Sequence, residues 1–140
     1  MPRLRRHPAE IGQLLAVLDP LEAQGLALGL PRAAVLRLRL LAEELFINSV
    51  LHGCGRTAGG CVAWALKPGR TTLGLRYLDN GPPWPPPAQP GDTDPQRVGG
   101  QGLRLLEAMA SRLTRRRLGG WNVVHLEILL RNGSCLPPAS

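Results

Sequence analysis

The sequence predicts an α+β fold in which a mainly antiparallel sheet is covered by helices on one face. Three observations predict it: a leucine-rich helical period before His52, an alternation of apolar residues after Gly60, and a Gly119–Gly120 turn between two apolar runs. The expected order is two helices, two strands, a long loop, a helix and two strands, which is typical of a two-layer α/β sandwich. With 140 residues and 15.1 kDa, the chain has the size of one domain.

The two expected helices cover residues 8–29 and 31–52. Apolar residues of the first recur at approximately helical spacing, and Pro20 is expected to bend or divide it. Pro31 is suited to the first turn of the second helix, and Gly53 is suited to end it. The second helix has the best helical pattern in the chain.

The rest of the chain is expected to form two hairpins, with a loop and a helix between them. The expected strands cover residues 61–66, 71–78, 113–118 and 121–130. The intervening loop holds seven of the fourteen prolines, which is typical of a functional lid or a disordered loop, and a helix begins after Gly102. We therefore expect an N-terminal extension (1–8), one domain (9–131) with a lid at about 82–99, and a frayed tail (132–140).

Composition limits the classes of function. Hydrophobic residues make up 44% of the chain and charged residues 19%, as in globular proteins, and the 4% of aromatic residues argues against a base-stacking surface. The formal net charge of +7 fits either a surface that attracts polyanions or a general arginine bias. Because the positive residues are scattered, apart from clusters at residues 3–6 and 115–117, the pattern favours a solvated face over a nucleic-acid footprint.

The three cysteines, Cys54, Cys61 and Cys135, include no CxxC pair, which argues against a disulfide framework or a zinc site. We expect Cys61 to be a buried strand residue and Cys54 a loop residue, and neither to be a nucleophile. Trp64 and Trp121 are expected to pack on strands. A reducing cytoplasm is the expected location, since no apolar run approaches the ~20 residues that span a bilayer.

Glu44, Asn48 and His52 are spaced by four residues on the second helix, so they lie on one face, one turn apart. Such polar groups among leucines need partners, because burial without partners costs a few kcal/mol for each group. One alternative is that Glu44 and Asn48 are simply exposed to solvent.

Two further motifs lie where an expected strand ends and where an expected helix begins. Asp79, Asn80 and Gly81 end an expected strand, and Gly100 and Gly102 precede an expected helix, where free N–H groups and the helix dipole bind phosphate. Each motif alone is weak, because Asp-Asn-Gly is a common turn and Gly-x-Gly is often only a tight connection. Their order along the chain is the more specific signal.

Together these motifs resemble the three nucleotide-binding boxes of the GHKL ATPase superfamily. The resemblance rests on ELFINSVLHG at residues 44–53, DNGPPW at 79–84 and GGQGL at 99–103, and it covers about residues 9–131. The most similar branch is that of the anti-sigma-factor serine/threonine kinases, in which the asparagine helix ends in His-Gly and DxG is followed by Pro-Pro and an aromatic residue. The resemblance implies the histidine-kinase-like (Bergerat) sandwich, with ATP or ADP and Mg²⁺ as cofactors.

The resemblance also implies roles for individual residues. Asn48 would bind Mg²⁺ through its side-chain oxygen, and Glu44 would be the general base. Asp79 would accept a hydrogen bond from the adenine amino group, and Gly81 would let the backbone approach the base. The remaining implied nucleotide contacts are His52 beside the triphosphate, Gly100, Gly102 and Leu103 at the helix start, and Asn122 on the last strand.

The lid would close over the nucleotide. Its only cation is Arg97, which would contact a phosphate or, equally, remain a solvated loop arginine, and Trp84 would anchor the loop or shield the adenine. The family usually begins with an extra strand, and we expect this strand to be absent here because about eight residues precede the first helix. The sequence does not decide between a monomer and a homodimer. His52 is not expected to be a phosphoacceptor, since the chain leaves no room for the dimerisation helices of histidine kinases.

By resemblance, the expected function is phosphoryl transfer from Mg·ATP to a serine or threonine of an anti-anti-sigma (STAS-type) partner, which controls a sigma factor. One alternative is a non-catalytic nucleotide-binding module that sequesters a partner protein. A less favoured alternative is a basic nucleic-acid-binding domain, suggested by the net charge alone.

Overall fold

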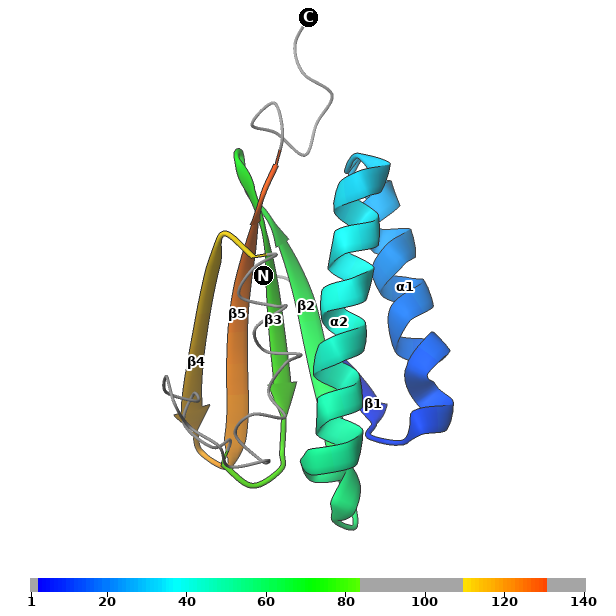
Figure 1. The fold of residues 1–140 in the computed structure, drawn as a ribbon, viewed down its shortest axis with the longest axis vertical. Coiled ribbons are helices and arrows are strands. Elements are labelled where there is room, and N and C mark those ends of the chain that lie inside the picture. Colours follow the sequence, from blue (N-terminus) through cyan, green and yellow to red (C-terminus); the bar gives the residue numbers. More distant parts are fainter. Residues whose placement is uncertain (1–2, 84–109, 131–140) are drawn as a thin grey trace, which may run out of the picture.

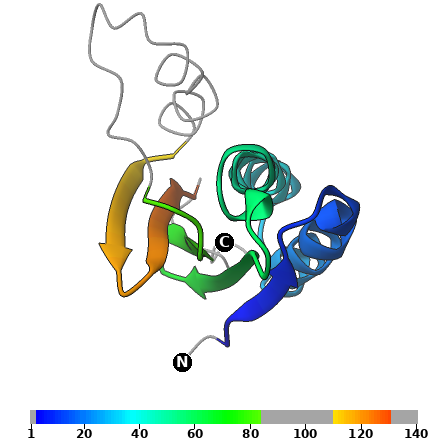
Figure 2. The same cartoon turned by 90° about the horizontal axis from the view of Figure 1, so that it is seen from below.

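The computed structural model describes residues 3–83 and 110–130. Within them, all neighbouring strands are antiparallel, in a five-stranded sheet of order β1-β2-β3-β5-β4. The helices lie together on one face of this sheet (Figures 1 and 2). The predicted α+β sandwich is confirmed. The elements in chain order are β1 (Arg5–Pro8), η1 (Ile11–Gln13), α1 (Leu14–Ala27), α2 (Arg32–His52), η2 (Cys54–Arg56), β2 (Cys61–Pro68), β3 (Thr72–Asp79), β4 (Arg112–Leu118) and β5 (Trp121–Leu129).

Pro20 is expected to bend or divide the first helix, and of these two outcomes the division is wrong, because helix α1 runs through Pro20 as one helix. Proline in a helix interior costs about 3 kcal/mol. The neighbouring side chains of Val17, Leu18 and Leu21 are at most 2% exposed, and burying each contributes about 1.5–3 kcal/mol, which outweighs the proline. Arg39 of α2 adds ion pairs to two acidic residues of α1, at 3.1 and 3.2 Å.

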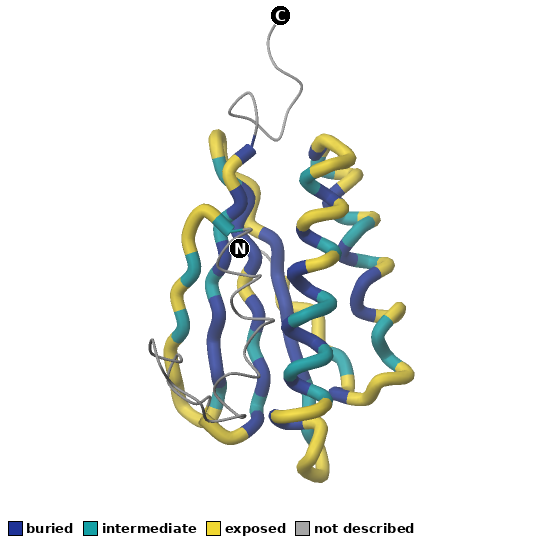
Figure 3. The backbone as a smooth tube through the Cα atoms, viewed as in Figure 1, coloured by how far each residue is buried: buried dark blue, intermediate teal, exposed yellow. Residues whose placement is uncertain are grey.

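Helix α2 packs its apolar stripe against the sheet and α1. It begins after Pro31 and ends at Gly53, as the sequence predicts. Figure 3 shows buried stretches of the neighbouring strands beside this helix. The residues of α2 that are buried are Val35, Leu38, Leu41, Ala42, Leu45, Phe46 and Ser49.

The N-terminal strand is present, and its expected absence is wrong. β1 pairs with β2 from Arg5↔Trp64 to Pro8↔Cys61, so part of the predicted extension belongs to the sheet. The indole Nε1–H of Trp64 donates to His7 Nε2 at 3.1 Å, and the two rings are parallel. Burial, aided by the charge of Arg5, lowers the pKa of His7, which favours the neutral ring that this hydrogen bond requires.

The inner face of the sheet supplies the other half of the core. Trp64 and Tyr77 are each 1% exposed and lie opposite each other on β2 and β3, so the packing role predicted for Trp64 is confirmed. Cys54, expected in a loop, is instead fully buried within η2. The aliphatic residues of this layer are Val62, Leu66, Leu73, Leu75, Val124, Leu126 and Ile128.

Strands β4 and β5 form the predicted hairpin. Gly119 and Gly120 have φ angles of 48° and 83°, so both occupy the left-handed region that a two-residue type I′ turn requires. Leu118 therefore pairs with Trp121, and the register continues along both strands. Leu113, the first residue of the expected strand, lies in β4.

Candidate functional site

The last residue of β3, Asp79, is a fully buried carboxylate. Its Oδ1 accepts hydrogen bonds from the Gly81 N–H at 3.0 Å and from Asn122 Nδ2 at 2.8 Å, and its Oδ2 accepts one from Ser49 Oγ at 3.1 Å. These donors offset the high cost of burying a polar group. They also fix the plane of the carboxylate at the end of the strand.

Asn122 reaches Asp79 because β3 and β5 pair, with Asp79 directly opposite Asn122. The structure thus brings together two residues that the sequence placed in one site. The amide of Asn122 has a fixed orientation: its Nδ2 also donates to the Pro82 carbonyl at 2.8 Å, and its Oδ1 accepts from Arg117 Nη1 at 3.2 Å.

Sequence reasoning missed Arg117. Its guanidinium donates both to Asn122 and to the Gly81 carbonyl at 2.6 Å, so it ties the β4–β5 hairpin to the segment that follows β3. The signal was available, because a two-residue turn at 119–120 places Arg117 opposite Asn122 across the hairpin.

Sequence reasoning also missed Ser49 and Tyr77. Ser49 follows Asn48 on α2 and is 1% exposed. Its hydroxyl donates to Asp79 Oδ2 and lies 2.8 Å from the Tyr77 hydroxyl, which donates to the Leu45 carbonyl at 3.3 Å. Burial raises the pKa of Tyr77 well above its usual value, so this donor stays protonated. A chain of hydroxyl groups thus links β3 to α2 and ends at the carboxylate.

Glu44, Asn48 and His52 follow one another by single turns of α2. Glu44 and Asn48 are half-buried, and His52 is exposed at the last residue of the helix. Ser49 lies next to Asn48 and contacts Asp79, so α2 holds this stripe beside the end of β3. Glu44 and Asn48 are thus partly open to solvent, as the solvent-facing alternative also expects.

A model of the histidine kinase-like ATPase domain matches residues 7–128 of the chain, which is most of its length. The chain belongs to this family. Solved structures agree with the assignment of fold. The chain superposes with a TM-score of 0.56, at 18% identity and over 86% of its length, on the histidine kinase domain of the blue-light activated histidine kinase EL346 from Erythrobacter litoralis.

The same score, identity and coverage hold for a structure of the Erythrobacter litoralis EL346 kinase itself. The chain spans 62% of the first of these structures and 40% of the second. A search of curated proteins found no significant match. The family assignment makes this chain an ATP-binding domain of the kinase-like type, with the fold that such kinases share.

Gly81 is constrained in this ATPase domain by the protein itself. A Cβ at Gly81 would lie 2.5 Å from the Cys54 backbone nitrogen and 3.1 Å from its Cβ, so η2 leaves no room for a side chain there. The resemblance gives another reason for the glycine, namely the approach of the base. The packing of η2 alone already requires it.

Cys54 itself is no nucleophile. Burial and the negative charge of Asp79 raise the pKa of its thiol to about 11, so the thiolate is scarce at neutral pH. Its thiol also contacts the Cys61 carbonyl at 3.5 Å.

Part of the predicted site lies outside the described residues. This part comprises the predicted phosphate contacts Arg97, Gly100, Gly102 and Leu103, together with Trp84 and most of the predicted lid. Within the two described ranges, no helix of this ATPase domain is both long enough and apolar enough to cross a bilayer.

The residues of the described half fit an adenine nucleotide with Mg²⁺. Asp79 offers a carboxylate that accepts hydrogen bonds from Ser49, Gly81 and Asn122 and can accept one from adenine. Asn48 offers an amide oxygen, a hard ligand of the kind that Mg²⁺ prefers. Glu44 adds a carboxylate one helical turn away from that amide.

Proposed function

We propose that this domain is a protein serine/threonine kinase that uses Mg·ATP to phosphorylate a STAS-type anti-anti-sigma partner and so regulates a sigma factor. One observation supports it most: α2 carries Glu44 and Asn48 one turn apart and, through Ser49, is hydrogen-bonded to the buried Asp79. Helix α2 thus carries the proposed base and the proposed metal ligand, and Ser49 connects it to the proposed adenine acceptor.

Asp79 selects adenine in this proposal. Donors from three different elements of the chain point at its carboxylate, so it acts as an acceptor. The exocyclic amino group of adenine can donate to it, whereas guanine presents a carbonyl oxygen at the same position. Two facing oxygens repel each other, and a buried polar group left without its partner costs about 1–3 kcal/mol.

Asn48 and Glu44 carry the chemistry. Asn48 would hold Mg²⁺ through its amide oxygen, and the bound ion supplies charge neutralisation at the phosphates. Glu44 would accept the proton of the partner's serine or threonine hydroxyl as that oxygen attacks the γ-phosphate, while the bond to the β-phosphate breaks and ADP leaves. The half-buried position of Glu44 limits its exposure to water and leaves it open to a docked hydroxyl.

The test is transfer of radiolabelled phosphate from ATP to a STAS protein of the same organism. We expect Glu44→Gln to lower the transfer rate by about 100-fold or more, since general bases contribute 10²–10⁴-fold, and to leave ATP binding in place. Glu43→Gln is the matched control, because Glu43 is the adjacent half-buried glutamate of α2. Equal rates for the two variants would contradict the role of Glu44. ATP binding with no transfer to any STAS protein would favour a nucleotide-dependent binding module instead.

A further inference from the structure

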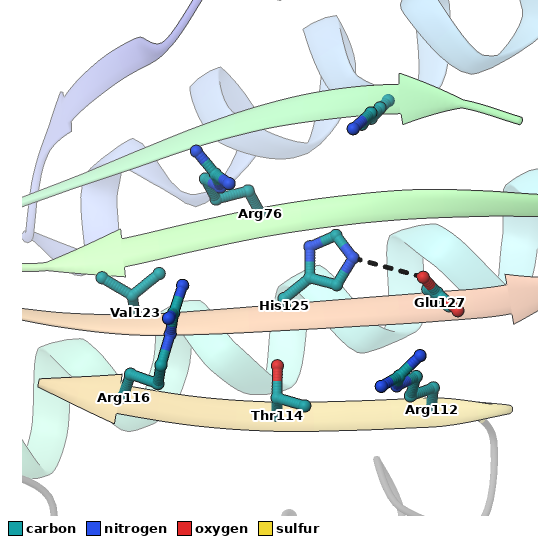
Figure 4. Close-up of a pocket in the computed structure, with 8 residues that line it drawn as sticks. Arg76, Arg112, Thr114, Arg116, Val123, His125 and Glu127 are labelled. Carbon is teal, nitrogen blue, oxygen red and sulfur yellow. Dashed lines mark ion pairs between the residues drawn. The ribbon is translucent and has the colours of Figure 1, made fainter.

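The outer face of the sheet, turned away from the helices, holds a cationic hollow of about 460 Å³. It is lined by four permanent cations from three strands, together with His125 and Glu127 of β5 (Figure 4). These cations are far apart in the sequence, and the sheet brings them together. They are Lys67 of β2, Arg76 of β3, and Arg112 and Arg116 of β4.

The strand register explains why a hollow forms here. Lys67 lies opposite Gly74, Gly74 opposite Glu127, and Glu127 opposite Arg112, so a row of long side chains is interrupted at the glycine. A Cβ at Gly74 would lie 3.3 Å from His125 Cε1, so the imidazole lies close to the bare backbone. The long cationic side chains therefore surround a depression in the sheet surface at Gly74.

The charge of the hollow is strongly unbalanced. Four cations face one carboxylate, that of Glu127, and this carboxylate lies 3.5 Å from His125 Nε2. Like charges brought together by a sheet repel one another and add nothing to its stability. A ligand of opposite charge would remove that repulsion.

Apolar side chains flank the cations on the same face. Alternation along β4 and β5 places Leu118 and Leu129 on the outer face, where they are 52% and 62% exposed. Trp121, on this face too, lies under the Arg6 guanidinium, 5.5 Å from the ring centroid. This ring is therefore not open for base stacking, and a phosphate backbone offers nothing apolar to the leucines.

We propose that the cationic hollow is the docking site for an acidic segment of a partner protein, one that carries several carboxylates and flanking apolar side chains. The carboxylates would pair with Arg76, Arg112, Arg116 and Lys67, and the apolar residues would cover Leu118 and Leu129. Because Asp79 and α2 lie on the other face of the sheet, such a partner and a nucleotide can bind together. This inference does not depend on the proposed kinase reaction.

The experiment is fluorescence anisotropy with a fluorescein-labelled peptide of alternating glutamate and leucine. The comparison probes are a lysine–leucine peptide of equal length and labelled single-stranded and duplex DNA. The full chain is titrated into each probe at low and at moderate salt. We expect the acidic peptide to bind most tightly and its affinity to fall as salt rises.

The decisive variant is the double substitution Arg76→Gln/Arg112→Gln. Its control is Arg32→Gln/Arg37→Gln, which removes the same charge from exposed positions of α2. We expect the first to weaken peptide binding by about fivefold, because it removes two of the four cations that line the hollow, and the second to change it less than about twofold.

A second variant, Thr114→Glu, keeps the test independent of the folding of the double variant. Thr114 is exposed in β4 and lines the hollow, so the new carboxylate repels the acidic probe there. We expect it too to weaken binding. Equal losses in the two double variants, or tighter binding of DNA that depends on Arg76 and Arg112, would overturn the proposal.

Discussion

At the scale of single residues, Asp79 shows how the fold gives a short motif a defined environment. The triplet Asp79, Asn80 and Gly81 is an ordinary turn in the sequence. In the fold, its carboxylate is completely buried and is oriented by donors from α2, from β5 and from its own turn. The sequence could identify the acid, but it could not identify Ser49 as a donor, because that contact joins residues 30 positions apart.

Arg117 gives the first prediction at this scale. Arg117→Met removes the bonds to the Gly81 carbonyl and to Asn122 Oδ1, so the Asn122 amide loses one of the contacts that orient it toward Asp79. We expect ADP affinity, measured by isothermal titration calorimetry, to fall by about 3- to 10-fold, in line with hydrogen bonds of about 0.5–1.5 kcal/mol. Arg116→Met, next on β4 and on the opposite face, is the control. Equal affinities of the two variants would show that Arg117 plays no part in the site.

The second prediction at this scale concerns Cys54. Its folded pKa of about 11 exceeds the usual 9.0, so at pH 8 the folded protein holds about 100-fold less thiolate at this position than the unfolded chain. We expect iodoacetamide to label Cys54 far more slowly in the native protein than in urea. Trypsin cleavage at Arg56 separates Cys54 from Cys61 for mass spectrometry. Equal labelling rates in both conditions would contradict the burial.

The same shift has a consequence for stability. The unfolded chain releases the Cys54 proton above about pH 9, while the folded protein keeps it up to about pH 11. Its contribution to the free energy of unfolding is therefore fully present below pH 9 and is lost as the pH rises through 11.

At the scale of elements, local patterns predicted the two long helices and both hairpins. They did not predict β1, because Arg5–Pro8 has no apolar alternation and its partner, β2, lies more than 50 residues away. They also predicted a bend or a division at Pro20, and α1 is not divided there. The periodicity of α1 could not show how tightly its leucines pack on α2. Local signals thus succeed where neighbouring residues in sequence decide the structure.

The β4–β5 turn carries the third prediction. Gly120 has φ of 83°, and an L-residue in the left-handed region costs about 1–2 kcal/mol, so Gly120→Ala should lower the free energy of unfolding by about that amount in urea titrations. Gly119→Asn should change it by less than about 0.5 kcal/mol, because asparagine tolerates the first position of a type I′ turn. Equal and small effects of both would mean that the turn has another geometry.

At the scale of the whole molecule, the two faces of the sheet carry different groups of polar and charged side chains. The inner face and α2 gather Asp79, Asn122 and the stripe of Glu44 and Asn48, while the outer face gathers the cations of the hollow. Local sequence patterns could not assemble either set, because both depend on the β3–β5 pairing, which joins residues 43 positions apart. The sequence predicted Asp79 and Asn122 as members of one site through the family resemblance, and the pairing supplies the physical cause.

The most direct test of a site for an adenine nucleotide is the melting temperature of the wild-type chain with Mg·ATP, with Mg·GTP and with Mg²⁺ alone. At a hundredfold excess of ligand over its dissociation constant, ATP should add about 2.7 kcal/mol to the stability of the fold and raise the melting temperature by several degrees. GTP at the same concentration should raise it clearly less, because Asp79 accepts hydrogen bonds and guanine offers no donor amino group there. No shift with ATP, or equal shifts with both nucleotides, would contradict the account.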